Sequence, residues 1–309
     1  MGKKSVKKQR YKLQDGDISA YLMLVPTFAL FAIFTIYPIL WALRYMFYEY
    51  DGVSEMHFIG LENFIRVFTR DPEWWKSVSN TFLFASGKLI IEIPLALVLA
   101  FLLTQKIKGK GFFRCAYFMP TVTSAAVMGL VFSFLFSSYN GIANTYLEKL
   151  GIISKSLEWL ADKKLAMLTV IIVSVWQNFG QNVILLMTGL LNIPEEIYES
   201  AKIDGANKTQ SFFKITLPML APMLQLVLML AIIGSLQSFD SIFVLTGGGP
   251  DRATEIMGIA IYNKFFASTG VVADYGYGAT LAFVSAVIIG IFTVIYMKLT
   301  SGMKDADGK

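Results

Sequence analysis

Six long apolar stretches constrain the fold of this 309-residue chain more than any other feature of its sequence. Each is long enough to cross a bilayer core, because about 20 predominantly apolar residues span it as a helix. The stretches lie at 18–43, 78–104, 115–137, 165–190, 217–243 and 276–297. The segments between them are rich in charged residues, glycine and proline, whose backbone polar groups would be left unsatisfied in hydrocarbon. We therefore predict an all-α, polytopic membrane protein with a six-span domain over 18–299 and short tails at 1–17 and 300–309.

Composition supports a membrane protein and argues against several functional classes. Only 16% of the residues are charged, against about 25% in soluble domains. The single cysteine, Cys115, and the single histidine, His57, supply too few ligands for a disulfide framework or a zinc or iron site. They also supply no acid–base constellation for a membrane enzyme, so we expect no catalytic residue, metal or resident cofactor. No basic, aromatic-interleaved soluble segment is present to indicate nucleic-acid binding.

The distribution of Lys and Arg predicts the topology. The tails and loops at 1–17, 105–114, 191–216 and 298–309 carry 16 of the 27 basic residues, and the longer opposite set carries 10. Because cytoplasmic loops are enriched in positive charge, both termini are predicted to be cytoplasmic. The strongest contributions come from Lys3, Lys4, Lys7, Lys8, Arg10, Lys12, Lys106, Lys108, Lys110 and Arg114. The first stretch is too long for a signal-peptide core and has no small-residue cleavage site before Arg44, so it is taken as a span.

The cytoplasmic loop at 191–216 is longer and more apolar than a simple connection needs. Pro194 and the two glutamates after it suit the start of a short helix. Asp204 is expected to cap a second helix that runs through Lys214, with Gly205 permitting a sharp bend between the two. Apolar side chains on the water side of this loop imply a protein surface that receives them. They are Ile197, Tyr198, Ile203, Phe212 and Phe213.

The sequence from Glu199 to Ala206, followed by Phe213 to Pro218, resembles the Glu-Ala-Ala loop of the permease subunits of ATP-binding-cassette (ABC) importers. In that family the loop forms coupling helices that lie in a groove of the ATPase subunit. The resemblance implies that ATPase coupling is carried by Glu199, Ser200, Ala201, Asp204, Gly205 and Ala206. Ser200 stands where the family's middle alanine is expected, a small change that should not abolish docking.

Further motifs extend the resemblance to the carbohydrate branch of the family, which includes the maltose transporter. These motifs are Gly60 to Phe64, Gly141 to Asn144 and Thr246 to Pro250. The glycine run in the last of them is not followed by Gly-Lys-Ser/Thr, so it is predicted to be a turn and not a nucleotide site. The large external domain and extra spans of the larger maltose-transporter subunit are missing from this chain.

The resemblance also implies partners and a location. A separate ATPase dimer would bind ATP and Mg, a second permease subunit would complete the pathway, and an extracytoplasmic solute-binding protein would deliver a carbohydrate. The expected location is the lipid of a bacterial cell membrane, with alternating access as the mechanism.

Polar residues inside the spans are the candidates for internal contacts, because charged groups there are costly and usually face the protein interior. Lys88 and Glu92 lie one helical turn apart and are predicted to form a structural ion pair, with a substrate contact as the alternative.

Two polar clusters are predicted to line the substrate pathway. They comprise Trp176, Gln177, Asn178 and Gln181 in the fourth span and Gln237, Ser238, Phe239 and Asp240 in the fifth. Amides and hydroxyls pair with sugar hydroxyls, and an aromatic ring stacks on the apolar face of a pyranose. Hydrogen bonding between helices is the alternative role. The nature of the solute stays open among saccharides, polyols and glycerol phosphates, and an ion-coupled carrier is the rival class, although the internal repeats typical of such carriers are not seen.

Overall fold

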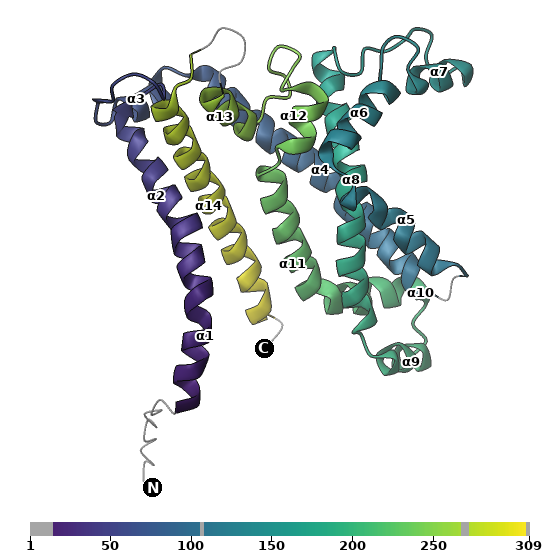
Figure 1. The fold of residues 1–309 in the computed structure, drawn as a ribbon. Helices are drawn as coiled ribbons and strands as arrows, with labels where there is room; N and C mark the ends of the chain where they lie inside the picture. Colours follow the sequence, from purple (N-terminus) through teal and green to yellow (C-terminus); the bar gives the residue numbers. More distant parts are fainter. Residues whose placement is uncertain (1–14, 106–107, 267–271, 307–309) are drawn as a thin grey trace.

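The computed structural model describes residues 15–105, 108–266 and 272–306 and is helical over most of its length (Figure 1). Five helices are long and apolar enough to cross a membrane, and a bent pair supplies a sixth span if it is counted as one. The prediction of an all-α protein with about six spans is therefore confirmed. The basic residues from Lys3 to Lys12, and Lys106, lie outside the described residues.

The first span stands apart from the rest of the bundle (Figure 1). It comprises α1 (Asp15–Phe31), the π-turn η1 (Ala32–Ile36), α2 (Tyr37–Leu43) and the short 3₁₀ segment η2 (Arg44–Phe47). The π-turn comes just before Pro38, which has no N–H to donate to the preceding turn. None of its apolar window is buried against other parts of this chain.

The core of the bundle is the contact between α4 (Pro72–Thr104) and α8 (Lys163–Leu191). Ala96 and Ala100 are fully buried on α4, and the fully buried Leu186 on α8 belongs to the same apolar cluster. Small residues let helix backbones approach closely in a membrane protein. The remaining long helices are α11 (Leu217–Leu236) and α14 (Tyr275–Ala306), and α11 packs against both α4 and α8.

Short elements gather at the two ends of the bundle (Figure 1). One end holds a two-stranded antiparallel hairpin and four short helices: β1 (Tyr48–Glu49), β2 (His57–Phe58), α3 (Glu62–Thr69), α7 (Ile142–Lys149), α12 (Asp240–Thr246) and α13 (Met257–Phe265). The other end holds α9 (Glu195–Ile203) and α10 (Lys208–Ser211), and the first turn of α1 and the last turn of α14 lie toward that end as well. This arrangement fits an even number of crossings, and the cytoplasmic placement of the termini stays a prediction.

Two expected spans are interrupted in the structure. The stretch at 115–137 is divided into α5 (Lys110–Val122) and α6 (Ala125–Leu135), which are bent by 99°. Pro120 lies in the last turn of α5, and the Ser124 hydroxyl caps the start of α6. The fifth stretch is helical only to Leu236, and α12 starts after a break at 237–239. The sequence prediction of one continuous helix was wrong in both places, because apolar composition alone does not reveal where a helix stops and restarts.

A close approach of α5 to α8 depends on Gly180. A Cβ atom at this position would fall on the Tyr117 carbonyl oxygen and lie 2.7 Å from its carbon. Both atoms belong to the backbone, so relief would require the helices to separate.

We expect Gly180→Ala to lower the free energy of unfolding by about 1–3 kcal/mol, since overpacking at a rigid contact costs that much. Gly290→Ala is the matched control, because its added Cβ meets nothing within 4 Å and alanine favours the helix by about 1 kcal/mol. Thermal unfolding of the purified protein in detergent measures both. Equal behaviour of the two variants would contradict the close contact.

Candidate functional site

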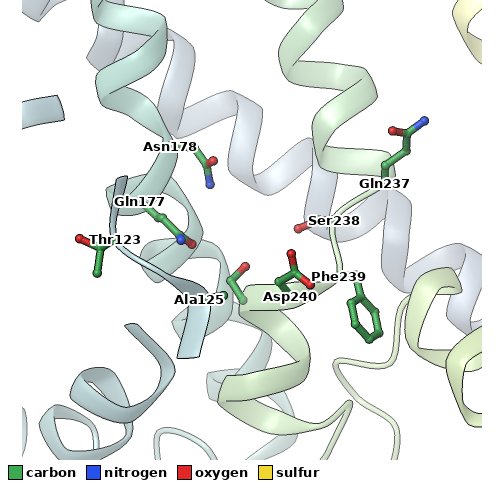
Figure 2. A pocket seen from close by; sticks show the side chains of 9 residues that line it. Thr123, Ala125, Gln177, Asn178, Gln237, Ser238, Phe239 and Asp240 are labelled. Atoms are coloured by element: carbon green, nitrogen blue, oxygen red, sulfur yellow. The ribbon is translucent and has the colours of Figure 1, made fainter. Parts of the chain in front are cut away.

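The two helix breaks and the middle of α8 line an open cavity of about 340 Å³ (Figure 2). It is lined by Thr123, Ala125, Gln177, Asn178, Gln237, Ser238, Phe239, Asp240 and Ser241. The first two residues lie at the α5–α6 bend, the next two on α8, and the last five at the α11–α12 break. Figure 2 shows Gln177, Asn178, Ser238 and Asp240 directed toward one space from these different elements. Three segments that are distant in sequence therefore build one polar site.

Hydrogen bonds hold the cavity walls in place. Thr121 donates its hydroxyl to the carbonyl of Gln177 at 3.0 Å, which fastens the end of α5 to α8. Asn178 donates its amide to the carbonyl of Ser174 at 2.8 Å, leaving its side-chain oxygen free of any bond within the described chain. Phe239 stacks on Phe243 with ring centroids 5.0 Å apart and also contacts Tyr262. The ring is thus backed by other aromatic side chains at the cavity wall.

Six of the eight residues predicted for the substrate pathway line this cavity. They are Gln177, Asn178, Gln237, Ser238, Phe239 and Asp240. Trp176 and Gln181 do not line it. The Trp176 ring packs edge-on against Phe132 at 5.3 Å, and Gln181 is exposed elsewhere on α8. Thr123 and Ala125 were missed, because the third stretch was read as continuous. The run Pro-Thr-Val-Thr-Ser at 120–124 is the signal that could have located the bend.

A buried polar network lies next to the cavity, between α4 and α8. Lys88 Nζ is 3.5 Å from Glu92 Oε2, and Asn182 donates to Glu92 Oε1 at 2.7 Å. The relative exposures of Lys88, Glu92 and Asn182 are 5%, 1% and 7%. None of the three lines the cavity, so the geometry favours helix-to-helix fixation over a substrate contact.

We expect Glu92→Gln to lower the free energy of unfolding by about 3–5 kcal/mol, because it leaves a buried lysine without its counter-charge. The double change with Lys88→Met is expected to recover much of this loss. Glu62→Gln is the control: it breaks an exposed 2.6 Å pair with Arg70, which is worth less than about 1 kcal/mol. Thermal unfolding in detergent compares them, and similar losses for Glu92→Gln and Glu62→Gln would refute a buried pairing.

The loop that resembles a coupling element folds as helix, turn and helix. Pro194 precedes the first helical residue of α9, with Glu195 and Glu196 in its first turn. Gly205 has a φ of +79°, and the N–H groups of Gly205 and Ala206 bond to the carbonyls of Lys202 and Ala201 at 3.2 and 2.9 Å. This pair of bonds is a Schellman motif, which ends a helix on a left-handed glycine.

The second helix of this loop starts later than predicted. Asp204 does not cap it and instead follows the last residue of α9. The cap is Asn207, which accepts from the N–H of Gln210 at 2.8 Å and donates its own N–H to the Gln210 side chain at 2.9 Å. The left-handed turn at Gly205 moves the restart by three residues, so the expectation for Asp204 was wrong.

One face of the α9–α10 loop packs against the helix bundle, and another face is exposed. Ala201 is buried, the Tyr198 hydroxyl lies 3.0 Å from that of Thr216, and Phe212 packs edge-on against Phe101 of α4 at 5.1 Å. Ile203 is 86% exposed at the end of α9, and Phe213 is 61% exposed. Glu199, Ser200, Asp204 and Gly205 are also exposed, and Ala206 is half-buried.

The glycine run after α12 is a turn, as expected. Gly247 and Gly248 have φ values of +60° and +92°, and the Thr254 hydroxyl bonds to the Gly249 carbonyl at 2.7 Å. The segment after it is anchored to α4, where the buried Glu255 accepts from Ser77 at 3.0 Å. Asp251 pairs with Lys163 at the start of α8, and this hydrogen bond and the lysine charge lower the pKa of the Asp251 carboxyl. The turn and the segment after it join the ends of two core helices.

Broken helices around a polar cavity, together with an exposed helix–turn–helix at one end of the bundle, are the features of a polytopic permease of the importer type. The chain belongs to the family described as "Binding-protein-dependent transport system inner membrane component", which matches residues 92–304. The resemblance found in the sequence is thereby confirmed.

Relatives support this assignment over nearly the whole chain. The probable ABC transporter permease protein YurN of Bacillus subtilis (strain 168) is 33% identical over 289 residues, covering 93% of this chain and 97% of YurN. The multiple sugar-binding transport system permease protein MsmF of Streptococcus mutans is 33% identical, covering 91% and 94%. The trehalose/maltose transport system permease protein MalF of Thermococcus litoralis is 31% identical, covering 92% and 94%.

Solved structures share the fold. A bacterial ABC transporter involved in the import of the acidic polysaccharide alginate matches with a TM-score of 0.79 and 20% identity, covering 93% of this chain and 96% of that one. The same kind of transporter, in complex with a periplasmic protein bound to an alginate pentasaccharide, matches with a TM-score of 0.77 and 21% identity, covering 91% and 93%. The ABC importer permease fold is confirmed.

Proposed function

We propose that this chain forms half of the translocation pathway of an ATP-driven carbohydrate importer in a bacterial cell membrane. The observation that carries the proposal is the cavity between the two helix breaks, whose amides, hydroxyls and aromatic ring suit a sugar. Relatives named for sugars support the same cargo class. A second permease subunit supplies the other half of the pathway, and an extracytoplasmic solute-binding protein delivers the cargo.

Coupling to ATP is proposed to run through the segment from Glu199 to Ala206. A partner ATPase dimer, which binds ATP and Mg, receives the exposed end of α9. Movement there reaches the cavity directly, because α8 continues from the cavity-lining Asn178 to Leu191, three residues before Pro194. A second contact, Phe212 on Phe101, passes the movement to α4. The chain itself acts as a transport subunit, and ATP hydrolysis belongs to the partner.

We expect Ile203→Asp to disrupt ATPase docking, because a charge replaces an exposed apolar anchor. A well-packed anchor contributes about 2 kcal/mol or more, so ATPase recovered with the tagged permease should fall roughly 30-fold. Ile152→Asp is the matched control: this isoleucine is 65% exposed and follows α7, which lies at the opposite end of the bundle (Figure 1). Retention of normal ATPase recovery by Ile203→Asp, or equal loss in both variants, would remove the support for docking at this loop.

We expect Asn178→Leu to reduce solute uptake by about tenfold or more while ATPase recovery stays normal, since a half-buried hydrogen-bonding group for the cargo is lost. Gln181→Leu removes an amide from the same helix outside the cavity and should have the smaller effect. Uptake of radiolabelled sugars by cells producing the complete importer measures both. Unchanged uptake with Asn178→Leu would argue against the cavity as the pathway, and uptake of glycerol phosphate alone would redirect the cargo class.

A further inference from the structure

The cavity carries a negative charge in addition to its neutral polar groups. Asp240 is the one ionisable residue among those that line it, and no lysine, arginine or histidine of the described chain is among them. Its carboxylate is exposed and makes no hydrogen bond or ion pair with any described residue. The other polar walls are neutral amides and hydroxyls. The cavity therefore presents one uncompensated negative charge to whatever enters.

We propose that Asp240 makes this half of the pathway selective for uncharged saccharides and against acidic ones, an inference that rests on the proposed function. A carboxylate accepts hydrogen bonds from sugar hydroxyls, and bonds to a charged acceptor are about twice as strong as those between neutral groups. A uronate or a sugar phosphate can donate from its hydroxyls as well, but its own negative charge is repelled by the Asp240 carboxylate. Selectivity of this kind uses attraction for one cargo and repulsion of another.

The shared fold does not predict the charge of the cargo. The transporter involved in alginate import has the same architecture and handles an acidic polysaccharide, yet only 20% of aligned residues are identical. Cargo charge is set by the side chains at the cavity, so two permeases of one fold can differ in it. On this criterion, glycerol phosphates are also poor candidates for this chain.

Thiol chemistry tests the cavity's charge without knowledge of the cargo. Cys115 is the single cysteine of this chain, so Cys115→Ser provides a permease subunit without thiols for assembly into the complete importer. Ser238→Cys, and separately Ala125→Cys, then places one thiol in the cavity. Tyr139→Cys, at a position 85% exposed in the segment between α6 and α7, is the remote control. Each is modified with cationic trimethylammonioethyl and anionic sulfonatoethyl methanethiosulfonate, and the ratio of the two rates is taken.

The ratio cancels effects on the thiol itself, because both reagents attack the same thiolate. We expect the cation-to-anion ratio at the cavity cysteines to exceed that at Tyr139→Cys by about tenfold or more, as a single nearby charge acts on the two reagents in opposite directions. Adding Asp240→Asn should bring the cavity ratio to within about twofold of the control, and Asp240→Glu should retain it. A cavity ratio equal to the control, or one unchanged by Asp240→Asn, would overturn the inference. The comparison between the cavity cysteines and Tyr139→Cys is made with Asp240 intact, so it tests the inference even if the Asp240 variants do not fold.

Failure of the proposed function gives a different result. The uncharged reagent methyl methanethiosulfonate should stop ATP-driven sugar uptake by the Ser238→Cys importer and leave the Tyr139→Cys importer active. If uptake continues after full modification of Ser238→Cys, the cavity is not the pathway, whatever the charge ratio shows. If uptake stops but the ratio is unselective, the pathway stands and the charge selectivity does not.

Discussion

Hydrocarbon offers no hydrogen-bond partner to a peptide group, and this constraint organises the structure. A helix can be interrupted at membrane depth only where the freed backbone groups face protein or a wet cavity. The α5–α6 bend and the α11–α12 break meet this condition together, because both open onto the same polar space beside Gln177 and Asn178 of α8. The interruptions and the site are therefore one feature. Breaks of this kind are also where transporters place their binding groups.

The unbroken helices α4 and α8 supply the continuous packed contact that the interrupted spans do not. The α4–α8 pair buries an apolar cluster and a Lys88–Glu92–Asn182 network, and both helices run past the cavity to the end that holds α9 and α10. This continuous pair forms the framework beside the two interrupted spans, and α8 contributes Gln177 and Asn178 to the cavity. The exposed loop after α8 is attached to this framework through Phe212, which packs on Phe101 of α4, and through Tyr198, which packs on the same apolar cluster.

Much of this was predictable from the sequence, and the rest has identifiable reasons. Long apolar runs located the spans, and the spacing of Lys88 and Glu92 indicated their contact, since one helical turn separates them. The bend at Thr123 and the break at Gln237 were not predicted. Hydropathy indicates whether a segment lies in lipid or in water, but it does not indicate whether its helix is continuous. Trp176 and Gln181 share a polar run with Gln177 and Asn178, but a helix turns about 100° per residue, so neighbours in sequence face different surroundings.

The helix α8 also has a mechanical property that follows from where it is held. At about 1.5 Å per residue, its last residue, Leu191, lies roughly 14 Å beyond Asn182, whereas Asn178 lies only about 6 Å on the other side. If the bond between Asn182 and Glu92 serves as a fulcrum, α8 is a lever with unequal arms. A displacement of α9 would then arrive at the cavity reversed in direction and reduced to less than half. Distances from spin labels near Asn178 and near Leu191 to a reference label on α4, with and without ATP, would read this ratio directly.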